Sequence, residues 1–312
     1  MPTRSAATNT AKKNKIQILR ADALTTVPWL VHGFSTRQGG YSRVYGGDSL
    51  NLGHTKHDSA TLVEKNRVAF VQKLGALDSQ GNPWPLIADK PEGPRCAVLQ
   101  HGLRQVHSDL IHRVNGIPKQ PLVGDGVVSD TPGLLLGIQT ADCIPVVLVD
   151  VKRRAVGVFH AGWRGTVKRI VEKGVGEMRR WFKSSPRDIR AAIGPGIHNC
   201  CYEVGDEVRT QFESQFAYAA DLFHEVKESD VVRERYPLLF LTARAPGHSE
   251  LPRKLFLDLV EANRRQLLDA GVSARNISAL PHCTSCQADL LFSYRKEGGR
   301  TGRMMGVAGI RS

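Results

Sequence analysis

Short apolar runs separated by polar turn residues dominate the middle of the chain, and they predict a series of closely spaced strands. Runs this short, bounded by turn residues, are typical of buried β-strands. They span residues 96–100, 106–114, 126–130, 134–139, 144–150 and 155–160. Further strands are predicted at 16–19, 29–36, 189–194, 277–281, 290–295 and 302–310.

Apolar residues at helical spacing predict four helices among these strands. Residues 59–74 end at Gly75 and residues 255–270 end at Gly271, and glycine commonly ends a helix. Two more helices are predicted at 163–182 and from near Gly205 onward. Strands that cluster in sequence, with fewer helices between them, favour an α+β fold in which mixed β-sheets are sandwiched with flanking helices.

The first residues of the chain differ in character from the rest. Residues 1–15 are polar and basic and are predicted to form a disordered tail, whereas residues 16–312 are predicted to form a single domain. Loops are predicted at 37–53, 76–94 and 217–254. The glycine-rich first loop is of the kind that commonly carries functional residues.

The chain carries a formal net charge of +13, with 43 Lys and Arg against 30 Asp and Glu. Such a balance suggests anionic partners, which include phosphate-bearing small molecules, nucleic acid and acidic lipids. The basic residues are spread along the chain, so a nucleic-acid partner is not favoured. No apolar run reaches the roughly 20 residues of a membrane-spanning helix, and the N-terminus lacks the apolar segment of a secretion signal. A cytoplasmic protein without a membrane partner is therefore expected.

The cysteines do not form the pattern of a disulfide framework, and they are Cys96, Cys143, Cys200, Cys201, Cys283 and Cys286. A long chain without a secretion signal is expected to keep its thiols reduced. Metal ligation or thiol chemistry is the better use for at least one of them. Cys283 and Cys286 form a Cys-x-x-Cys, but a zinc ribbon needs a second pair, and none occurs at a useful spacing.

One cysteine and two histidines lie near the ends of three predicted strands. Cys143 follows the strand 134–139, His160 ends the strand 155–160, and His107 lies on the strand 106–114. One sulfur and two imidazole nitrogens, with a fourth position open, match the layout of a catalytic zinc ion, whereas structural zinc sites are closed by four ligands. Taken singly, each side chain could equally pack in the core. Asp142, beside Cys143, and Glu203 are candidates for moving a proton.

Three basic, glycine-containing stretches are candidates for binding an anion. HAGWRG (160–165) places Gly162 and Gly165 before a helix, where backbone N–H groups bind anions, and it adds the Arg164 guanidinium. Each stretch could also be a plain turn or a solvated loop. The other two stretches supply Ser35 and Arg37 from FSTRQGG, and Arg295, Arg300 and Arg303 from FSYRKEGGRTGR. Candidates to stack on a flat ring are Phe34, Trp163 and Tyr202.

These motifs occur together in one known family. HGFSTRQGG, LNLG, QVHS, TADCIPV, HAGWRG, CCYEV and FSYRKEGGRTGR follow one another as they do in YfiH-like proteins, also called laccase-domain, polyphenol oxidase or peptidoglycan editing factor proteins. The resemblance covers roughly residues 28–310. It implies a fold related to the Cys-His catalytic domain of a bacterial toxin, and a zinc site that maps onto His107, Cys143 and His160.

The resemblance also implies an activity for the single domain. Family members are purine nucleoside phosphorylases that act on adenosine, inosine, guanosine or methylthioadenosine with phosphate, and they also deaminate adenosine. They therefore combine transferase and hydrolase chemistry. Zinc is the implied metal, with copper as the alternative. GPGIHNCCYEV, HCTSC and the length of 217–254 depart from the family pattern, so the preferred nucleoside stays open, as do the oligomeric state and the physiological role.

Three other functions are weighed against this one. Cys143 as a thiolate nucleophile, with His160 or His107 as its base, would give an amidase acting on a peptidoglycan precursor. Copper-dependent oxidation of phenols is disfavoured, because laccases need several His-x-His pairs and the sequence contains none. A nucleic-acid binder rests on net charge alone.

Overall fold

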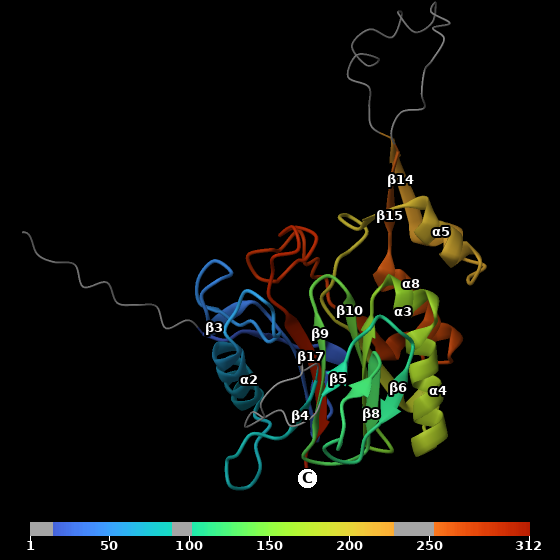
Figure 1. The fold of residues 1–312 in the computed structure, drawn as a ribbon. Coiled ribbons are helices and arrows are strands. Elements are labelled where there is room, and N and C mark those ends of the chain that lie inside the picture. The colour runs from blue at the N-terminus through green and yellow to red at the C-terminus, as the bar shows by residue number, and fades with distance from the viewer. Residues whose placement is uncertain (1–14, 89–101, 228–252) are drawn as a thin grey trace, which may run out of the picture.

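The computed structural model describes residues 15–88, 102–227 and 253–312, and it centres on two β-sheets packed face to face (Figure 1). Within the described residues, five strands form the first sheet in the order β1-β2-β17-β9-β4, and six form the second in the order β16-β12-β10-β11-β8-β6. Each sheet mixes parallel and antiparallel neighbours. The predicted α+β class with mixed sheets is confirmed.

The strands of both sheets follow the predicted apolar runs, except β4, which lies in the segment 76–94 that was predicted as a loop. The first sheet consists of β1 (Ile18–Leu19), β2 (Leu30–Ser35), β17 (Met304–Ile310), β9 (Leu135–Thr140) and β4 (Leu86–Ile87). The second consists of β16 (Ile277–Ala279), β12 (Ile189–Ile193), β10 (Ile144–Asp150), β11 (Ala155–Ala161), β8 (Gly126–Ser129) and β6 (Ile111–Arg113). The predicted strand at 96–100 and nearly all of the predicted tail at 1–15 lie outside the described residues.

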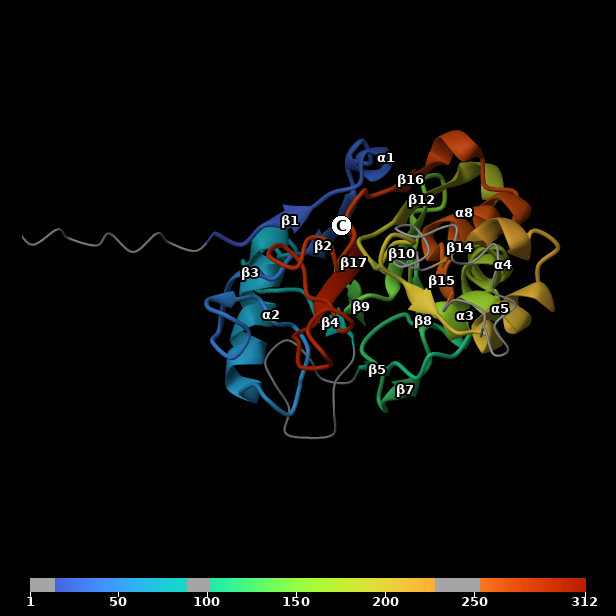
Figure 2. The ribbon, with the colours of Figure 1, turned by 90° about the horizontal axis from the view of Figure 1, so that it is seen from above.

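Helices cover the outer face of each sheet. Figure 1 and Figure 2 show α2 (Ala60–Leu74) against the first sheet, and α3 (Trp163–Val167), α4 (Ile170–Phe182) and α8 (Leu259–Asp269) against the second. Side chains alternate along each strand, so one strand serves two cores. In β10, Val147 and Val149 face the first sheet, whereas Val146 and Leu148 face the helices.

Two of the predicted helices differ from those in the structure. The helix predicted at 163–182 is broken at Arg169, whose positive φ of 63° is incompatible with a continuous α-helix. In the helix predicted at 255–270, the first residues are the end of β15 (Arg253–Leu257). Asp258 then caps α8, since its side chain accepts a hydrogen bond from the backbone N–H of Glu261.

Several predicted strands and loops also need correction. Within 106–114 only β6 is a strand, and His107 lies in a turn with a φ of 58°. Residues 290–295 form turns and irregular structure, not a strand. Leu291 and Phe292 are apolar because they pack in a small core with Tyr45. Two segments predicted as loops contain strands: β3 (Gln38–Ser42) lies within 37–53, and β14 (Phe223–Lys227) lies within 217–254.

Smaller elements complete the described chain. β14 pairs with β15, which also pairs with β13 (Glu203–Val204), and this small sheet stands beside α5 (Asp206–Glu213) at one end of the molecule in Figure 1. β5 (Leu103–Arg104) pairs with β7 (Leu122–Val123), and α1 (Asp22–Thr25) precedes β2. Short 3-10 turns occupy Pro186–Asp188, Ala219–Leu222 and Ala274–Asn276. Among the described residues, no helix has the length and apolar character needed to cross a membrane.

A buried histidine in the first sheet predicts acid sensitivity. His32 on β2 is 2% exposed, and its Nε2 finds no hydrogen-bond partner among the described residues. Burial, and then the Arg20 guanidinium, lower its pKa from 6.5 to about 4. Because the unfolded state then binds more protons, stability falls as the pH drops from about 6.5 to about 4, by about 3 kcal/mol.

Urea unfolding at about pH 7 and about pH 4.5 checks this expectation. His32→Gln removes the titrating group, so the variant should lose less stability between the two pH values than the wild-type protein does. An equal loss in both proteins would contradict the assignment to His32.

Candidate active site

Three predicted ligand side chains meet at one edge of the sandwich. The ligand atoms of His107, Cys143 and His160 all lie within 4.8 Å of one another. Cys143 Sγ lies 3.9 Å from His107 Nε2, and the two imidazole rings meet edge to face with centroids 4.8 Å apart. The fold thus brings together three side chains that span 53 positions of the sequence, from His107 to His160.

The topology explains this convergence. The turn Ala141–Cys143 carries the chain from β9 in the first sheet to β10 in the second. β10 and β11 pair with Ile144 opposite Ala161 and Pro145 opposite His160, so Cys143 lies one residue beyond the paired segment, close to His160. Asp142 and His107 have positive φ angles of 87° and 58°. Non-glycine residues in this region are uncommon, and such strain concentrates at functional sites.

Asp125, which the sequence did not single out, holds the site together. It is fully buried, and its carboxylate accepts hydrogen bonds from His160 Nδ1 at 2.8 Å and from the backbone N–H of His107 at 3.0 Å. It also accepts from the backbone N–H of Val106 and from both the N–H and the hydroxyl of Ser108. The only sequence signal was Gly-Asp-Gly at 124–126, which is equally a plain turn motif.

The charges of Cys143, His160 and Asp125 stabilise one another and shift the pKa of each side chain. Burial opposes ionisation of Cys143, but His160 and His107 outweigh it and lower the pKa of the thiol. Burial also opposes protonation of His160, but Cys143 and Asp125 outweigh it and raise the pKa of the imidazole. For Asp125, the hydrogen bond from His160 outweighs burial and lowers the pKa to about 2. The geometry therefore stabilises a Cys143 thiolate beside a cationic His160.

The donor set fits a metal ion. The hydrogen bond from His160 Nδ1 to Asp125 leaves Nε2 of His160 available, and His107 already turns its Nε2 toward Cys143. A carboxylate behind a ligating histidine fixes its tautomer and orientation in many metal sites. Three protein ligands of the S,N,N type leave one coordination position for water or substrate, as in catalytic zinc sites.

Gly162 keeps space open for these ligands. A Cβ at this position would lie 2.8 Å from Cys143 Sγ and 3.2 Å from His107 Cδ2. A Cβ at Gly165 would lie 3.2 Å from the backbone oxygens of both His160 and Ser108. Both glycines thus have a packing role. The helix that begins beside them, α3, is short, with only five residues. The anion-binding role predicted for this turn is not needed to explain them.

Gly162→Ala is expected to damage the site without unfolding the protein. Displacement of Cys143 and His107 should weaken zinc binding by on the order of tenfold or more, the size of effect seen when ligand geometry is disturbed. Gly176→Ala is the matched control, because a Cβ there meets nothing within 4 Å. Zinc competition with a chromogenic chelator measures both variants, and equal affinities would show that Gly162 does not protect the ligands.

A cavity of about 520 Å³ opens beside the three ligands. Its wall is basic and aromatic: Arg164, Arg295 and Arg303 contribute guanidinium groups, while Trp163, Tyr202 and Tyr294 contribute rings. The remaining lining includes Gln105, Gln139, Thr140, Ala141 and Asp142. A ligand with both an anionic group and a flat ring would match this wall.

Comparison with known proteins bears directly on this site. The family model described as multi-copper polyphenol oxidoreductase laccase matches residues 31–84 and 95–311. The chain belongs to this laccase-domain, or YfiH-like, family. The residues that match the family model include the three ligands and the arginines of the cavity. The resemblance stated from the sequence motifs is confirmed.

Relatives of this laccase-domain chain carry enzyme names. A purine nucleoside phosphorylase YlmD of Geobacillus stearothermophilus is 34% identical over 285 residues, which cover 90% of each chain. An adenosine deaminase RL5 from an unknown prokaryotic organism is 33% identical over 275 residues, covering 88% of this chain and 91% of the relative. The crystal structure of Bacillus licheniformis hypothetical protein YfiH superimposes with a TM-score of 0.71 at 30% identity, covering 90% and 93% of the two chains.

Some predicted residues of the laccase-domain chain lie away from the cavity. Arg37 donates to the carbonyl oxygens of Ala288 and Tyr45 and pairs with Glu297 at 3.2 Å. The Ser35 hydroxyl accepts from the backbone N–H of Met305, and Phe34 is buried in the core between the sheets. None of the three lines the cavity, so their predicted roles in phosphate binding and base stacking gain no support from this geometry.

Asp142 lies in the cavity wall but already has partners for both carboxylate oxygens. Oδ1 accepts from the hydroxyls of Thr284 at 2.6 Å and Ser293 at 2.7 Å, and Oδ2 accepts from the backbone N–H of Arg295 at 2.6 Å. These bonds fasten two C-terminal loops to the turn that carries Cys143. The geometry gives Asp142 a positioning role, and its role in proton transfer stays a prediction.

Proposed function

We propose that this laccase-domain chain is a zinc-dependent purine nucleoside phosphorylase that also deaminates adenosine. The observation that carries the proposal is the convergence of Cys143, His107 and His160 beside a cavity lined by three arginines and three aromatic rings. The names of the two relatives, a purine nucleoside phosphorylase and an adenosine deaminase, support the same pair of reactions. Adenosine, inosine, guanosine and methylthioadenosine are the proposed nucleosides.

The residues of the cavity divide the work between phosphate and nucleoside. In phosphorolysis, a phosphate oxygen forms the new bond to C1′ of the ribose as the bond from C1′ to the purine nitrogen breaks. Arg164, Arg295 and Arg303 would hold the phosphate, because guanidinium groups bind phosphate oxygens in pairs. Trp163 and Tyr202 would stack on the purine. A zinc ion held by the three ligands would supply Lewis acidity, which makes water a stronger acid.

Arg164 is the cavity arginine best placed to bind a free anion. Arg295 and Arg303 each donate to backbone carbonyl oxygens, whereas Arg164 lies exposed over the Trp163 ring and makes no ion pair within the described residues. Loss of a charge-assisted hydrogen bond costs about 1.5–3 kcal/mol. Arg164→Ala should therefore raise the KM for phosphate by about tenfold or more.

Deamination provides the internal control for this variant, because that reaction uses no phosphate. The kcat/KM for deamination of adenosine by Arg164→Ala should stay within about twofold of wild type. An equal loss of both activities would show that Arg164 acts on the nucleoside or on the fold and not on phosphate.

Product analysis of the purified protein tests the proposal as a whole. The protein is incubated with each of the four nucleosides, with and without phosphate, and the products are identified by chromatography and mass spectrometry. Free purine and the sugar 1-phosphate should form only with phosphate: ribose 1-phosphate from adenosine, inosine and guanosine, and 5-methylthioribose 1-phosphate from methylthioadenosine. Inosine should form from adenosine without phosphate. Metal analysis of the same sample identifies the bound ion. Absence of turnover by the metal-loaded protein would overturn the proposal.

A second candidate function rests on the electrostatics of Cys143. A thiol of lowered pKa beside His160, which is in turn oriented by Asp125, is also the arrangement of a cysteine hydrolase, such as an amidase acting on a peptidoglycan precursor. A nucleophile needs one base, however, and here two imidazoles face the sulfur. Full activity in the metal-free protein, abolished by iodoacetamide, would favour the hydrolase, whereas inactivation by a chelator and recovery with zinc would favour the phosphorylase.

A further inference from the structure

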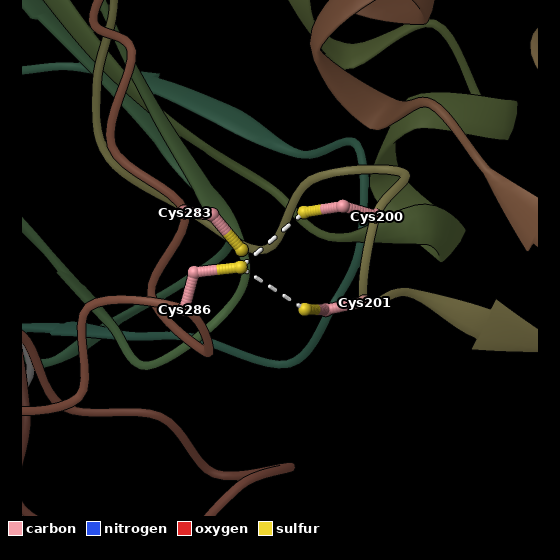
Figure 3. Close-up of side chains that lie close together, drawn as sticks. All are labelled: Cys200, Cys201, Cys283 and Cys286. Carbon is pink, nitrogen blue, oxygen red and sulfur yellow. Dashed lines mark hydrogen bonds between the residues drawn. The ribbon is translucent and has the colours of Figure 1, made fainter.

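Four of the remaining cysteines form a second cluster, separate from the candidate active site. Cys200 and Cys201 lie in the turn before β13, and Cys283 and Cys286 lie in the segment after β16. Their Sγ atoms all lie within 4.8 Å of one another. Figure 3 shows the four side chains directed toward a common centre, two from each segment. Two pairs of thiols more than 80 residues apart in sequence thus face each other.

The four sulfurs lie close enough together to share one tetrahedral metal ion. Zinc–sulfur bonds of about 2.3 Å place the sulfurs of a tetrahedral site about 3.8 Å apart. The Sγ atom of Cys286 lies 3.5 Å from that of Cys200 and 3.4 Å from that of Cys201, and no pair in the cluster exceeds 4.8 Å. A disulfide would need about 2.05 Å. We propose that Cys200, Cys201, Cys283 and Cys286 bind one structural zinc ion as a closed four-thiolate site.

Backbone contacts hold the two cysteine segments in register. Gly196 and Cys283 form a parallel β-bridge, and the backbone N–H of Thr284 donates to the carbonyl of Gly196 at 2.9 Å. The N–H of Cys201 donates to the carbonyl of His198, which closes the turn that presents the adjacent pair. Both pairs are therefore positioned by main-chain hydrogen bonds before any metal binds. Four cysteine ligands leave no open position, which is the pattern of structural and not catalytic zinc.

The cluster adjoins residues that line the cavity or contact its lining. Tyr202, which lines the cavity, follows Cys201 in sequence, and Thr284, between the other two cysteines, donates to the carboxylate of Asp142 beside Cys143. A metal ion joining the two segments would fix Tyr202 and Asp142 relative to each other. The second zinc ion would thus brace the cavity, and its loss should raise the KM for nucleoside more than it lowers kcat.

Metal stoichiometry tests the four-cysteine site independently of the proposed function. Wild-type protein purified with zinc should contain two zinc ions per chain, one in each cluster. Cys286→Ser, which removes an exposed ligand, should reduce this to one, and Cys143→Ser should also reduce it to one by emptying the other site. The combined variant should contain none. A Cys143→Ser protein that keeps one zinc ion would support the four-cysteine site even if the nucleoside activities proved absent.

Cobalt substitution adds a spectroscopic readout of how many thiolates bind the metal. The Cys143→Ser protein loaded with cobalt(II) should show the strong sulfur-to-cobalt charge-transfer absorption of four thiolates, and Cys286→Ser should show only the weak band of one. Mass spectrometry after alkylation of the metal-free protein should count these thiols as free. A Cys143→Ser protein without bound zinc, cobalt spectra without the four-thiolate band, or a disulfide within the cluster would each overturn the proposal.

Discussion

Cys143→Ala should abolish both phosphorolysis and deamination and remove the metal ion from the candidate active site. Cys143 is the only sulfur ligand of the three, and its thiolate lies between His107 and His160. Lewis-acid catalysis is worth several kcal/mol, so kcat/KM for adenosine should fall by on the order of 10³-fold or more. Steady-state kinetics with each nucleoside and zinc analysis of the same preparation measure the two losses together.

Two further variants serve as comparisons: one replaces a second ligand of the site, and the other replaces a histidine outside it. His107→Ala should behave like Cys143→Ala, because it removes another donor from the same ion. His112→Ala should keep both activities and the metal, since His112 on β6 contacts the carbonyl of Val123 and does not line the cavity. Full activity of a metal-loaded Cys143→Ala protein would rule out the metal scheme. Full loss of activity with normal zinc content would instead favour Cys143 as a nucleophile.

The strands of the sandwich could be predicted because their apolar runs are continuous. β10 and β11 are buried on both faces, one against the first sheet and one against helices, so nearly every position is apolar or small. The break at Arg169 and the strand β15 were missed for the opposite reason. Their conformations depend on contacts with distant residues, as in the pairing of β15 with β14, and local apolar spacing does not report such contacts.

The residues of the candidate site divide in the same way. Cys143 and His160 could be found because they follow apolar strands in distinctive motifs, but Asp125 lies in an ordinary Gly-Asp-Gly and gains its role only when β8 pairs with β11. The pairing of Phe159 with Gly126 brings Asp125 beside His160. Cys200 and Cys201 were likewise not predicted to join Cys283 and Cys286, because the two pairs are separated by more than 80 residues.

Asp125→Asn should test whether the buried carboxylate positions the metal ligands. One carboxylate oxygen becomes an amide N–H₂ group, and whichever oxygen is replaced, at least two donors lose their acceptor. Oδ1 receives His160 Nδ1 and the His107 N–H, while Oδ2 receives the N–H groups of Val106 and Ser108. We expect zinc affinity and kcat/KM to fall by about 10–100-fold, the usual cost of removing a partner behind a metal ligand.

Asp150→Ala separates this positioning role from a general loss of stability. Asp150 is also fully buried and accepts from the backbone N–H groups of Lys152 and Arg153, but it lies at the opposite end of β10 from Cys143. Both variants should lower the free energy of unfolding, because each removes an acceptor oxygen from backbone N–H groups. Only Asp125→Asn should lose zinc affinity, and excess zinc should restore part of its activity. If both variants lose zinc affinity equally, or neither does, Asp125 supports the fold and not the metal ligands.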